Sequence, residues 1–181
     1  GLSFNVEKAR ELMKKAGYED MTKFPKMILA FNTNENHQRV AENLQAQLKK
    51  NLGINLELKN EEWKVYLATL KSDPPHMFRF GWLADYPDPD NFMNLMTSYS
   101  ENNRTRWGNK KFDDLIVQAA SETDREKRRA MYSEAQKILV EADAPAVPVF
   151  NGVRQHLIAS RVENYPVNAL LRYVYKGVKL K

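Results

Sequence analysis

The sequence of 181 residues contains no cysteine, which excludes disulfides, thiolate zinc sites, cysteine nucleophiles and iron–sulfur clusters held by cysteine alone. Long apolar runs are also missing, because none approaches the roughly 20 residues that a membrane-spanning helix requires. The motifs G-x-S-x-G, Walker A, G-x-G-x-x-G and H-E-x-x-H do not occur. The sequence therefore carries no signature of the enzyme classes that these motifs mark.

Residues that bind metals are few and poorly arranged. The three histidines are far apart and form no metal-binding motif. Asp85, Asp88 and Asp90 share one short loop, and oxygen ligands at alternate positions are typical of a calcium loop. However, the sixth residue counted from Asp88 is Met93, where an EF-hand loop needs glycine. We therefore expect no metal and no cofactor, and we interpret the loop as an exposed turn in which Asp side chains cap backbone amides.

The charge balance is mildly basic. Lys and Arg number 28 against 23 Asp and Glu, which gives a net charge of +5. The basic residues are interleaved with acidic ones rather than clustered, so a soluble protein with a basic face is favoured over a nucleic-acid-binding module. The chain starts at Gly1 without a signal-peptide pattern, and we expect processing or the choice of segment to have set this start.

Composition and periodicity together indicate a globular α/β fold. Hydrophobic residues make up 43% and charged residues 28%, and the length fits a single domain over residues 1–181. The hydrophobic pattern of the first half predicts, in order, a helix from Asn5 to Gly17, a strand at 26–31, a helix from Asn34 to Gly53, a strand at 54–58, a helix starting at Asn60 and a strand at 77–82. Ligand sites on such sheets lie beyond the carboxyl ends of strands, which draws attention to the loop after Trp82.

The second half begins with this loop and then becomes helical. Alternating prolines predict no regular structure for residues 83–92. Asn109 and Asp124 can each cap an amphipathic helix, and the two helices are expected to form a hairpin. Beyond them, the sequence predicts strands at 146–150 and 156–159, joined by a tight turn at Asn151-Gly152, and a last strand within 174–180.

The stretch 79–89, which reads R-F-G-W-L-A-D-Y-P-D-P, carries a family resemblance. It resembles the G-W-x-A-D-Y-x-x-P motif of the periplasmic oligopeptide- and dipeptide-binding proteins of ABC transporters, the family 5 extracellular solute-binding proteins. The segments 4–17, 31–37, 52–54 and 62–63 resemble family sequence in the same order. The late A-V-P-V stretch at 146–149 is similar to a family strand, so the resemblance covers nearly the whole chain.

The resemblance implies a fold and a cellular role. The expected fold is α/β, a lobe like those of type II periplasmic binding proteins, with a central mixed sheet flanked by helices. Residues 1–181 would be the C-terminal lobe of a larger two-lobed protein whose N-terminal lobe is missing from this chain. Such a protein is not an enzyme: it captures short peptides between its lobes and delivers them to a membrane permease. It would be periplasmic or extracellular, with or without a lipid anchor.

The resemblance also implies how the peptide main chain is recognised. The aspartate of the motif, here Asp85, pairs with the α-ammonium group of the ligand, a charge-assisted hydrogen bond worth on the order of 1.5–3 kcal/mol. Backbone groups at Gly81 and Leu83 match the positions that extend the peptide as an added strand. A receptor that reads only these common features accepts many peptide sequences.

The remaining site residues are expected at the side chains and the carboxyl end of the ligand. Trp82 and Trp63 match tryptophans that line roomy side-chain pockets. Arg79 and His37 match positions that meet the ligand carboxylate in some oligopeptide binders. A further arginine of such binders is replaced here by Leu70, which leaves the preferred peptide length open.

Three other interpretations stay open at this point. A receptor of the same family can bind a metal chelate, haem or a murein peptide instead, although Asp85 favours a ligand with an amine. A hydrolase would use Asp85 and Asp88 as a carboxylate pair and would release products. A nucleic-acid module would lose affinity steeply with salt, and the interleaved acidic residues speak against it.

Overall fold

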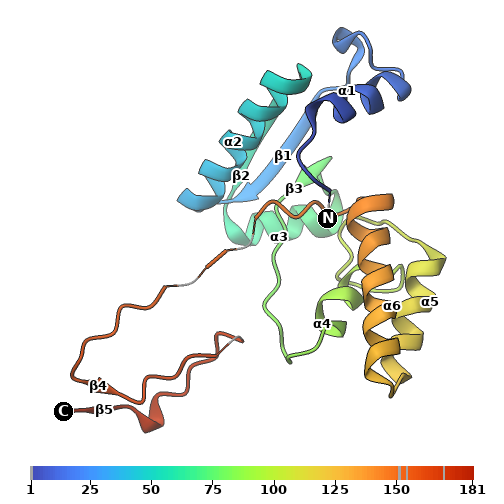
Figure 1. The fold of residues 1–181 in the computed structure, drawn as a ribbon. Helices are drawn as coiled ribbons and strands as arrows, with labels where there is room; N and C mark the ends of the chain where they lie inside the picture. The colour runs from blue at the N-terminus through green and yellow to red at the C-terminus, as the bar shows by residue number, and fades with distance from the viewer. Residues whose placement is uncertain (1, 151, 154, 169) are drawn as a thin grey trace. The chain divides into compact units, whose positions relative to one another are not determined.

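The computed structural model describes residues 2–150, 152–153, 155–168 and 170–181. These residues divide into two compact units, Leu2–Gly81 and Trp82–Lys181. Figure 1 shows the elements of both units in chain order. None of the helices in the described ranges combines the length and the apolar character needed to cross a membrane.

The first unit is built around a parallel sheet. Its elements are α1 (Val6–Lys15), a 3-10 turn (Met21–Lys23), β1 (Met27–Asn32), α2 (Glu35–Leu52), β2 (Leu56–Glu61), α3 (Trp63–Ser72) and β3 (Met77–Phe78). The strand order is β2-β1-β3, and both pairings are parallel. The α/β prediction is confirmed, but this sheet is parallel rather than mixed, because helices connect its successive strands.

The two faces of the sheet have separate cores. Leu29, Phe31 and Leu56 pack with Ala41 of α2 on one face. Ala30 packs with side chains of α3 on the other face. The alternation of neighbouring β1 residues between two cores is what a strand buried on both sides requires.

Local signals define the ends of the helices, with one exception. The side chain of Asn34 accepts hydrogen bonds from the first backbone N–H groups of α2, and Gly53 ends this helix with a positive φ of 72°. The third helix does not start at Asn60, as predicted, but is capped by Glu62. Asn60 belongs to β2, because the pairing of β2 with β1 continues as far as the Asn32–Glu61 pair.

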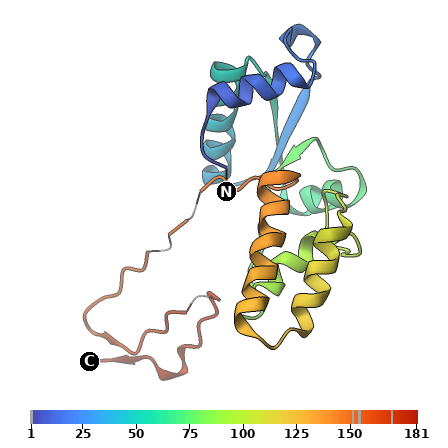
Figure 2. The same cartoon turned by 45° about the vertical axis from the view of Figure 1, so that its right-hand side comes forward.

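The second unit is mainly a helical hairpin. Its helices are α4 (Asp90–Met93), a 3-10 turn (Asn94–Met96), α5 (Lys110–Ser121) and α6 (Arg125–Lys137), and α6 continues as a π-helical turn (Ile138–Ala142). Figure 2 shows α5 and α6 side by side. Their caps are Asn109 and Asp124, so the predicted hairpin is confirmed. Its core includes the fully buried Phe112, Ala119 and Ala135.

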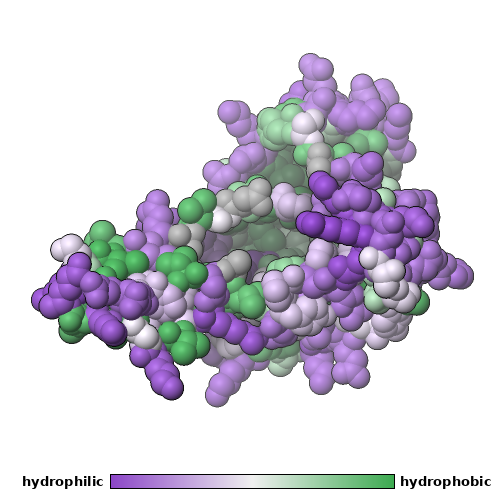
Figure 3. Space-filling model, turned by 60° about the horizontal axis from the view of Figure 1, so that its bottom comes forward, coloured by the Kyte–Doolittle hydropathy of each residue, from purple (hydrophilic) through white to green (hydrophobic). Residues whose placement is uncertain are grey.

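The C-terminal segment differs most from the prediction. No strand forms at 146–150 or 156–159, and the predicted turn at Asn151 lies outside the described residues. The predicted last strand is reduced to β5 (Lys179–Leu180), which follows a 3-10 turn (Tyr175–Gly177) and pairs antiparallel with β4 (Val162–Glu163). Figure 3 shows hydrophobic side chains exposed between hydrophilic ones along this segment, at the left of the view. A strand needs a neighbouring edge to satisfy its backbone, and the described residues at 146–159 pair with none.

Candidate functional site

Among the described residues, the stretch 80–84 of the motif has no backbone pairing. The backbone N–H of Arg79 donates to the carbonyl of Ala30 at 2.8 Å, and this bond is the last that joins the β3 edge to β1. In the described part of the chain, no backbone–backbone hydrogen bond involves residues 80–84. The predicted strand to Trp82 therefore ends early, at Phe78. The donors and acceptors that follow are available to an extended ligand.

A buried amide links two residues of the motif. Asn91, on α4, is only 7% exposed. Its Oδ1 accepts a hydrogen bond from the indole N–H of Trp82 at 2.9 Å and one from the backbone N–H of Asp85 at 3.2 Å. Sequence analysis missed both Asn91 and the short helix that carries it. The signal was Pro89 just before Asp90, since proline is common at the start of helices.

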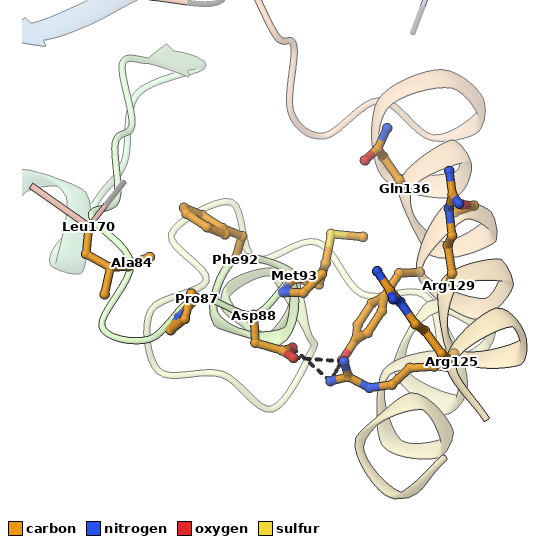
Figure 4. A pocket seen from close by; sticks show the side chains of 13 residues that line it. Ala84, Pro87, Asp88, Phe92, Met93, Arg125, Arg129, Gln136 and Leu170 are labelled. Atoms are coloured by element: carbon orange, nitrogen blue, oxygen red, sulfur yellow. Dashed lines mark hydrogen bonds and ion pairs between the residues drawn. The ribbon is translucent and has the colours of Figure 1, made fainter. Parts of the chain in front are cut away.

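Asp88 is fixed by a two-pronged ion pair. Its two carboxylate oxygens accept from the two terminal nitrogens of Arg128, each at 2.8 Å (Figure 4). Hydrogen bonding to Arg128 lowers the pKa of Asp88, and the same bonds raise the pKa of Arg128. Arg128 also donates to the Ala119 carbonyl and to the Tyr132 hydroxyl. Asp88 therefore anchors the motif loop, the residues 79–89 between β3 and α4, to the helical hairpin.

Asp85 has a more open environment. Its carboxylate accepts one hydrogen bond from Arg172, at 2.8 Å, and the two side chains are 61% and 62% exposed. Leu83 is exposed as well, at 68%. Asp85 thus presents a carboxylate to solvent from a loop whose backbone is held by Asn91.

Arg79 and His37 lie close enough to influence each other. Burial lowers the pKa of His37, and the nearby positive charge of Arg79 lowers it further. A side chain at Gly81 would place its Cβ 2.7 Å from a guanidinium nitrogen of Arg79, so glycine leaves room for this guanidinium. Because a neutral His37 and a charged Arg79 can both donate hydrogen bonds, the pair can bind a carboxylate.

Trp63 begins α3 and is 48% exposed. Its ring lies 6.4 Å from that of Tyr66, centroid to centroid. The Tyr66 hydroxyl is buried, which raises its pKa, and it donates to the backbone carbonyl of Arg79. Tyr66 thereby ties the start of the motif to α3, while Trp63 offers an aromatic surface to solvent.

The carboxyl ends of β1 and β2 hold two polar atoms that were not predicted. Asn32 Oδ1 and Glu61 Oε2 are buried and have no hydrogen-bond partner among the described residues. The other oxygen of Glu61 accepts from Lys59 at 2.9 Å and from Thr69 at 3.2 Å. Asn32 and Glu61 are register partners on neighbouring parallel strands, so they share one face of the sheet. Water or a ligand donor can satisfy these atoms.

Figure 4 looks into a groove of about 940 Å³ within the second unit. The motif loop contributes Ala84 and Pro87, and α6 contributes Arg125 and Arg129. Ala84 is the neighbour of Asp85, so the groove borders the loop that carries the predicted amine partner. The part of the chain that the structure describes holds no cluster of three or more His, Cys, Asp or Glu side chains suited to a metal ion.

The family model for bacterial extracellular solute-binding proteins, family 5, matches residues 2–104. The chain belongs to this family. The match includes the whole first unit, the motif and α4, so the resemblance seen in the sequence is confirmed.

This chain also resembles individual relatives over most of its own length. It is 36% identical over 160 residues to the periplasmic murein peptide-binding protein MppA of Escherichia coli, which covers 88% of this chain and 29% of the relative. It is 33% identical to the dipeptide-binding protein DppE of Bacillus subtilis, covering 98% of this chain and 32% of the relative. The chain therefore spans about a third of the length of these relatives.

A solved structure supports the same fold. The chain matches Haemophilus influenzae OppA in complex with RPPGFSPFR at a TM-score of 0.79 and 32% identity, covering 94% of this chain and 35% of that one. The prediction of a fold like that of type II periplasmic binding proteins is confirmed. The seven predicted ligand-contacting residues stay predictions, and the structure brings them to two places: His37, Trp63, Arg79 and Gly81 in the first unit, and Trp82, Leu83 and Asp85 in the second.

Proposed function

We propose that this chain is the C-terminal lobe of a peptide receptor that serves an ABC transporter. The complete receptor would lie in the periplasm or outside the cell, close over a short peptide with its N-terminal lobe, and deliver it to a membrane permease. Relatives named as periplasmic peptide-binding proteins and a peptide complex of a relative support this proposal.

The unpaired backbone at 80–84, followed directly by Asp85, is the observation that carries the proposal. An extended peptide can add to this stretch as a strand, because N–H and C=O groups alternate along it and have no backbone partner among the described residues. Asp85 then meets the α-ammonium group of the first ligand residue, which is mostly charged at neutral pH because such groups titrate near ~8. Recognition of this kind reads the ligand main chain and not its sequence.

The other predicted residues have supporting roles. Arg79 and His37 would bind the carboxylate of ligands of suitable length. Trp63 and Trp82 would line spaces for ligand side chains, where aromatic surfaces accept many shapes. The half-exposed state of both rings in this chain is consistent with such a role.

A hydrolase that uses Asp85 and Asp88 fits the geometry poorly. A general acid needs a raised pKa so that it carries a proton near neutral pH. Asp88 has a lowered pKa and both its oxygens are held by Arg128. We therefore propose that the protein binds its ligand without turning it over.

A murein peptide is the second candidate ligand, because the chain is 36% identical to a murein peptide-binding protein. Such a ligand shares the amide backbone and charged groups of ordinary peptides. Because ordinary peptides and murein peptides would make similar contacts with this chain, only their relative affinities can distinguish the two candidate ligands.

Calorimetry on the complete receptor tests the proposal. Trialanine, tetra-alanine and a murein tripeptide should bind with one-to-one stoichiometry, and product analysis should find them intact. This chain alone should bind them weakly or undetectably, because each 1.4 kcal/mol of lost contact weakens binding about tenfold. Sub-micromolar binding by the isolated chain, or release of cleaved products, would contradict the proposal.

A further inference from the structure

Asn91 is the point at which two predicted ligand contacts meet. The indole N–H of Trp82 and the backbone N–H of Asp85 can only donate hydrogen bonds, so the amide oxygen of Asn91 must face both. An amide oxygen has two lone pairs and can accept both bonds at once. One atom therefore sets the separation between an aromatic wall and a carboxylate-bearing backbone.

Asn91 is itself held firmly. It is 7% exposed and lies on α4, whose neighbours Met93, Leu95 and Met96 belong to the core of the hairpin. Its backbone N–H donates to the carbonyl of Asp88, the residue that Arg128 clamps. Because Asn91 is fixed by the hairpin core, the hydrogen bonds to its oxygen restrain Trp82 and the backbone of Asp85.

The motif loop needs such support because Trp82 and Asp85 have little of their own. No backbone hydrogen bond orders residues 80–84 in the described part of the chain, and Asp85 is mostly exposed. Without Asn91, the backbone at Asp85 would sample several orientations before a ligand arrives. Ordering it would then reduce the affinity of the ligand.

We infer that Asn91 is a positioning residue for amine recognition: it orients Trp82 and Asp85 together, so that the ligand ammonium group finds a preorganised carboxylate beside an aromatic wall. This inference rests on the proposed pairing of Asp85 with the ligand amine. Asn91 itself does not touch the ligand.

Two variants and a matched control test the inference in the complete receptor. Asn91→Leu has a similar shape but lacks the acceptor, and Asn91→Ser serves if the leucine variant does not fold. The control is Asn103→Leu, because Asn103 is likewise an amide that holds the second unit together: it is half-buried and donates to the carbonyls of Met96, Thr97 and Trp107. It has no hydrogen bond to the motif loop in the described residues.

The measured quantity is the affinity of trialanine divided by that of N-acetyl-trialanine. We expect Asn91→Leu or Asn91→Ser to reduce this ratio about tenfold, the loss that one hydrogen bond of average strength allows. Asn103→Leu should lower thermal stability and leave the ratio unchanged. If Asn91 only stabilised the fold, its substitution would weaken the binding of both peptides equally and leave the affinity ratio unchanged, as is expected for Asn103→Leu.

Hydrogen exchange gives a second measurement that needs no ligand. In Asn91→Leu, the backbone amide of Asp85 should exchange faster, because its acceptor is gone. Asn91→Asp keeps an acceptor oxygen and should restore the protection, whereas Asn103→Leu should not alter it. Equal exchange at Asp85 in all variants would overturn the inference.

The affinity ratios separate this inference from the function on which it rests. A large ratio in the unmutated receptor that survives Asn91→Leu would overturn the positioning role and leave the role of Asp85 intact. A ratio near one in the unmutated receptor would overturn both, because Asp85 would then not be the amine partner.

Discussion

Asp85 and Asp88 lie three positions apart in one loop and each contacts an arginine at 2.8 Å, yet the two pairs differ in exposure and in the number of hydrogen bonds. Asp88 uses both oxygens, is 32% exposed and faces an Arg128 that is 29% exposed. Asp85 uses one oxygen, and both it and Arg172 are more than 60% exposed. One side of the loop is fixed to the hairpin and the other is open to solvent.

The difference shows how one loop can combine rigidity with an accessible charge. Two parallel hydrogen bonds in partly dehydrated surroundings make the Asp88–Arg128 pair specific and strong. A single contact between exposed side chains is weak, because water and salt compete for both charges. Asp85 can therefore exchange its arginine for a ligand ammonium group while Asp88 holds the loop in place.

The largest expected effect concerns Asp85 as the ligand partner in the complete receptor. Asp85→Ala leaves an enclosed ammonium group without a counter-charge, at a cost of roughly 3–5 kcal/mol in binding free energy. N-acetylation of the peptide should cost about as much for the unmutated receptor, because it removes the same pair from the other side. Isothermal titration of the four combinations should show that the two losses do not add.

Asp88 provides the control for this cycle. Asp88→Ala should reduce stability, but acetylation should still weaken binding by most of its original factor. If acetylated and free peptides bind the unmutated receptor equally, Asp85 is not the amine partner and the two aspartates do not differ in function.

The next effect concerns stability on the clamped side of the loop. Arg128→Met removes the partner of both Asp88 oxygens and should lower the free energy of unfolding by about 1.5–3 kcal/mol, the range for hydrogen bonds to charged groups. Urea denaturation measures this loss. The matched variant Arg172→Met removes the exposed arginine and should change the unfolding midpoint little. Equal losses for the two variants would mean that burial does not distinguish the pairs.

The pH dependence of stability should reveal the same pair. The folded-state pKa of Asp88 is lowered, mainly by hydrogen bonding to Arg128, whereas an unfolded Asp titrates near ~3.9. The stabilisation is therefore complete above the unfolded pKa and is lost as the pH falls through the folded pKa. Asp88→Asn should be less stable than the unmutated protein at pH 7, and the gap should close in strong acid. When both proteins also carry Arg128→Met, the difference in stability caused by Asp88→Asn should depend much less on pH.

Sequence reasoning succeeded where the signal was local. The caps at Asn34, Asn109 and Asp124 and the hydrophobic periodicity of the helices depend on neighbours within a few residues. The order of strands and helices from β1 to β3 followed from the same periodicity. These local features are present although the chain spans only about a third of the length of its relatives.

The failures involve partners that are distant in sequence. The predicted strands after residue 146 need an adjacent edge, and periodicity cannot say whether one exists. The short helix α4 follows Pro89, which can start a helix, but its buried Met93 packs in a core formed with residues of α5 and α6 that lie far along the sequence. For the site, the motif identified Asp85, but Arg128 is 40 positions from Asp88 and nothing in the sequence pairs them. Asn91 was missed for a related reason, since its role depends on a folded loop.

The smallest expected effect concerns Arg172 as a competitor for Asp85. Its guanidinium donates a hydrogen bond to the Asp85 carboxylate, the group that a ligand ammonium would need to contact. Arg172→Gln keeps a polar side chain but removes the charge, and it should strengthen the binding of free trialanine by at most about fivefold, because exposed pairs are weak. The gain should shrink as salt is added, since salt already screens this pair. Arg129→Gln removes the same charge from α6 and should not produce the gain, and neither should Arg172→Gln with the acetylated peptide. A weaker affinity for free trialanine in Arg172→Gln would mean that Arg172 assists Asp85, so that the open side of the loop, like the clamped side, uses its arginine to hold the aspartate in place.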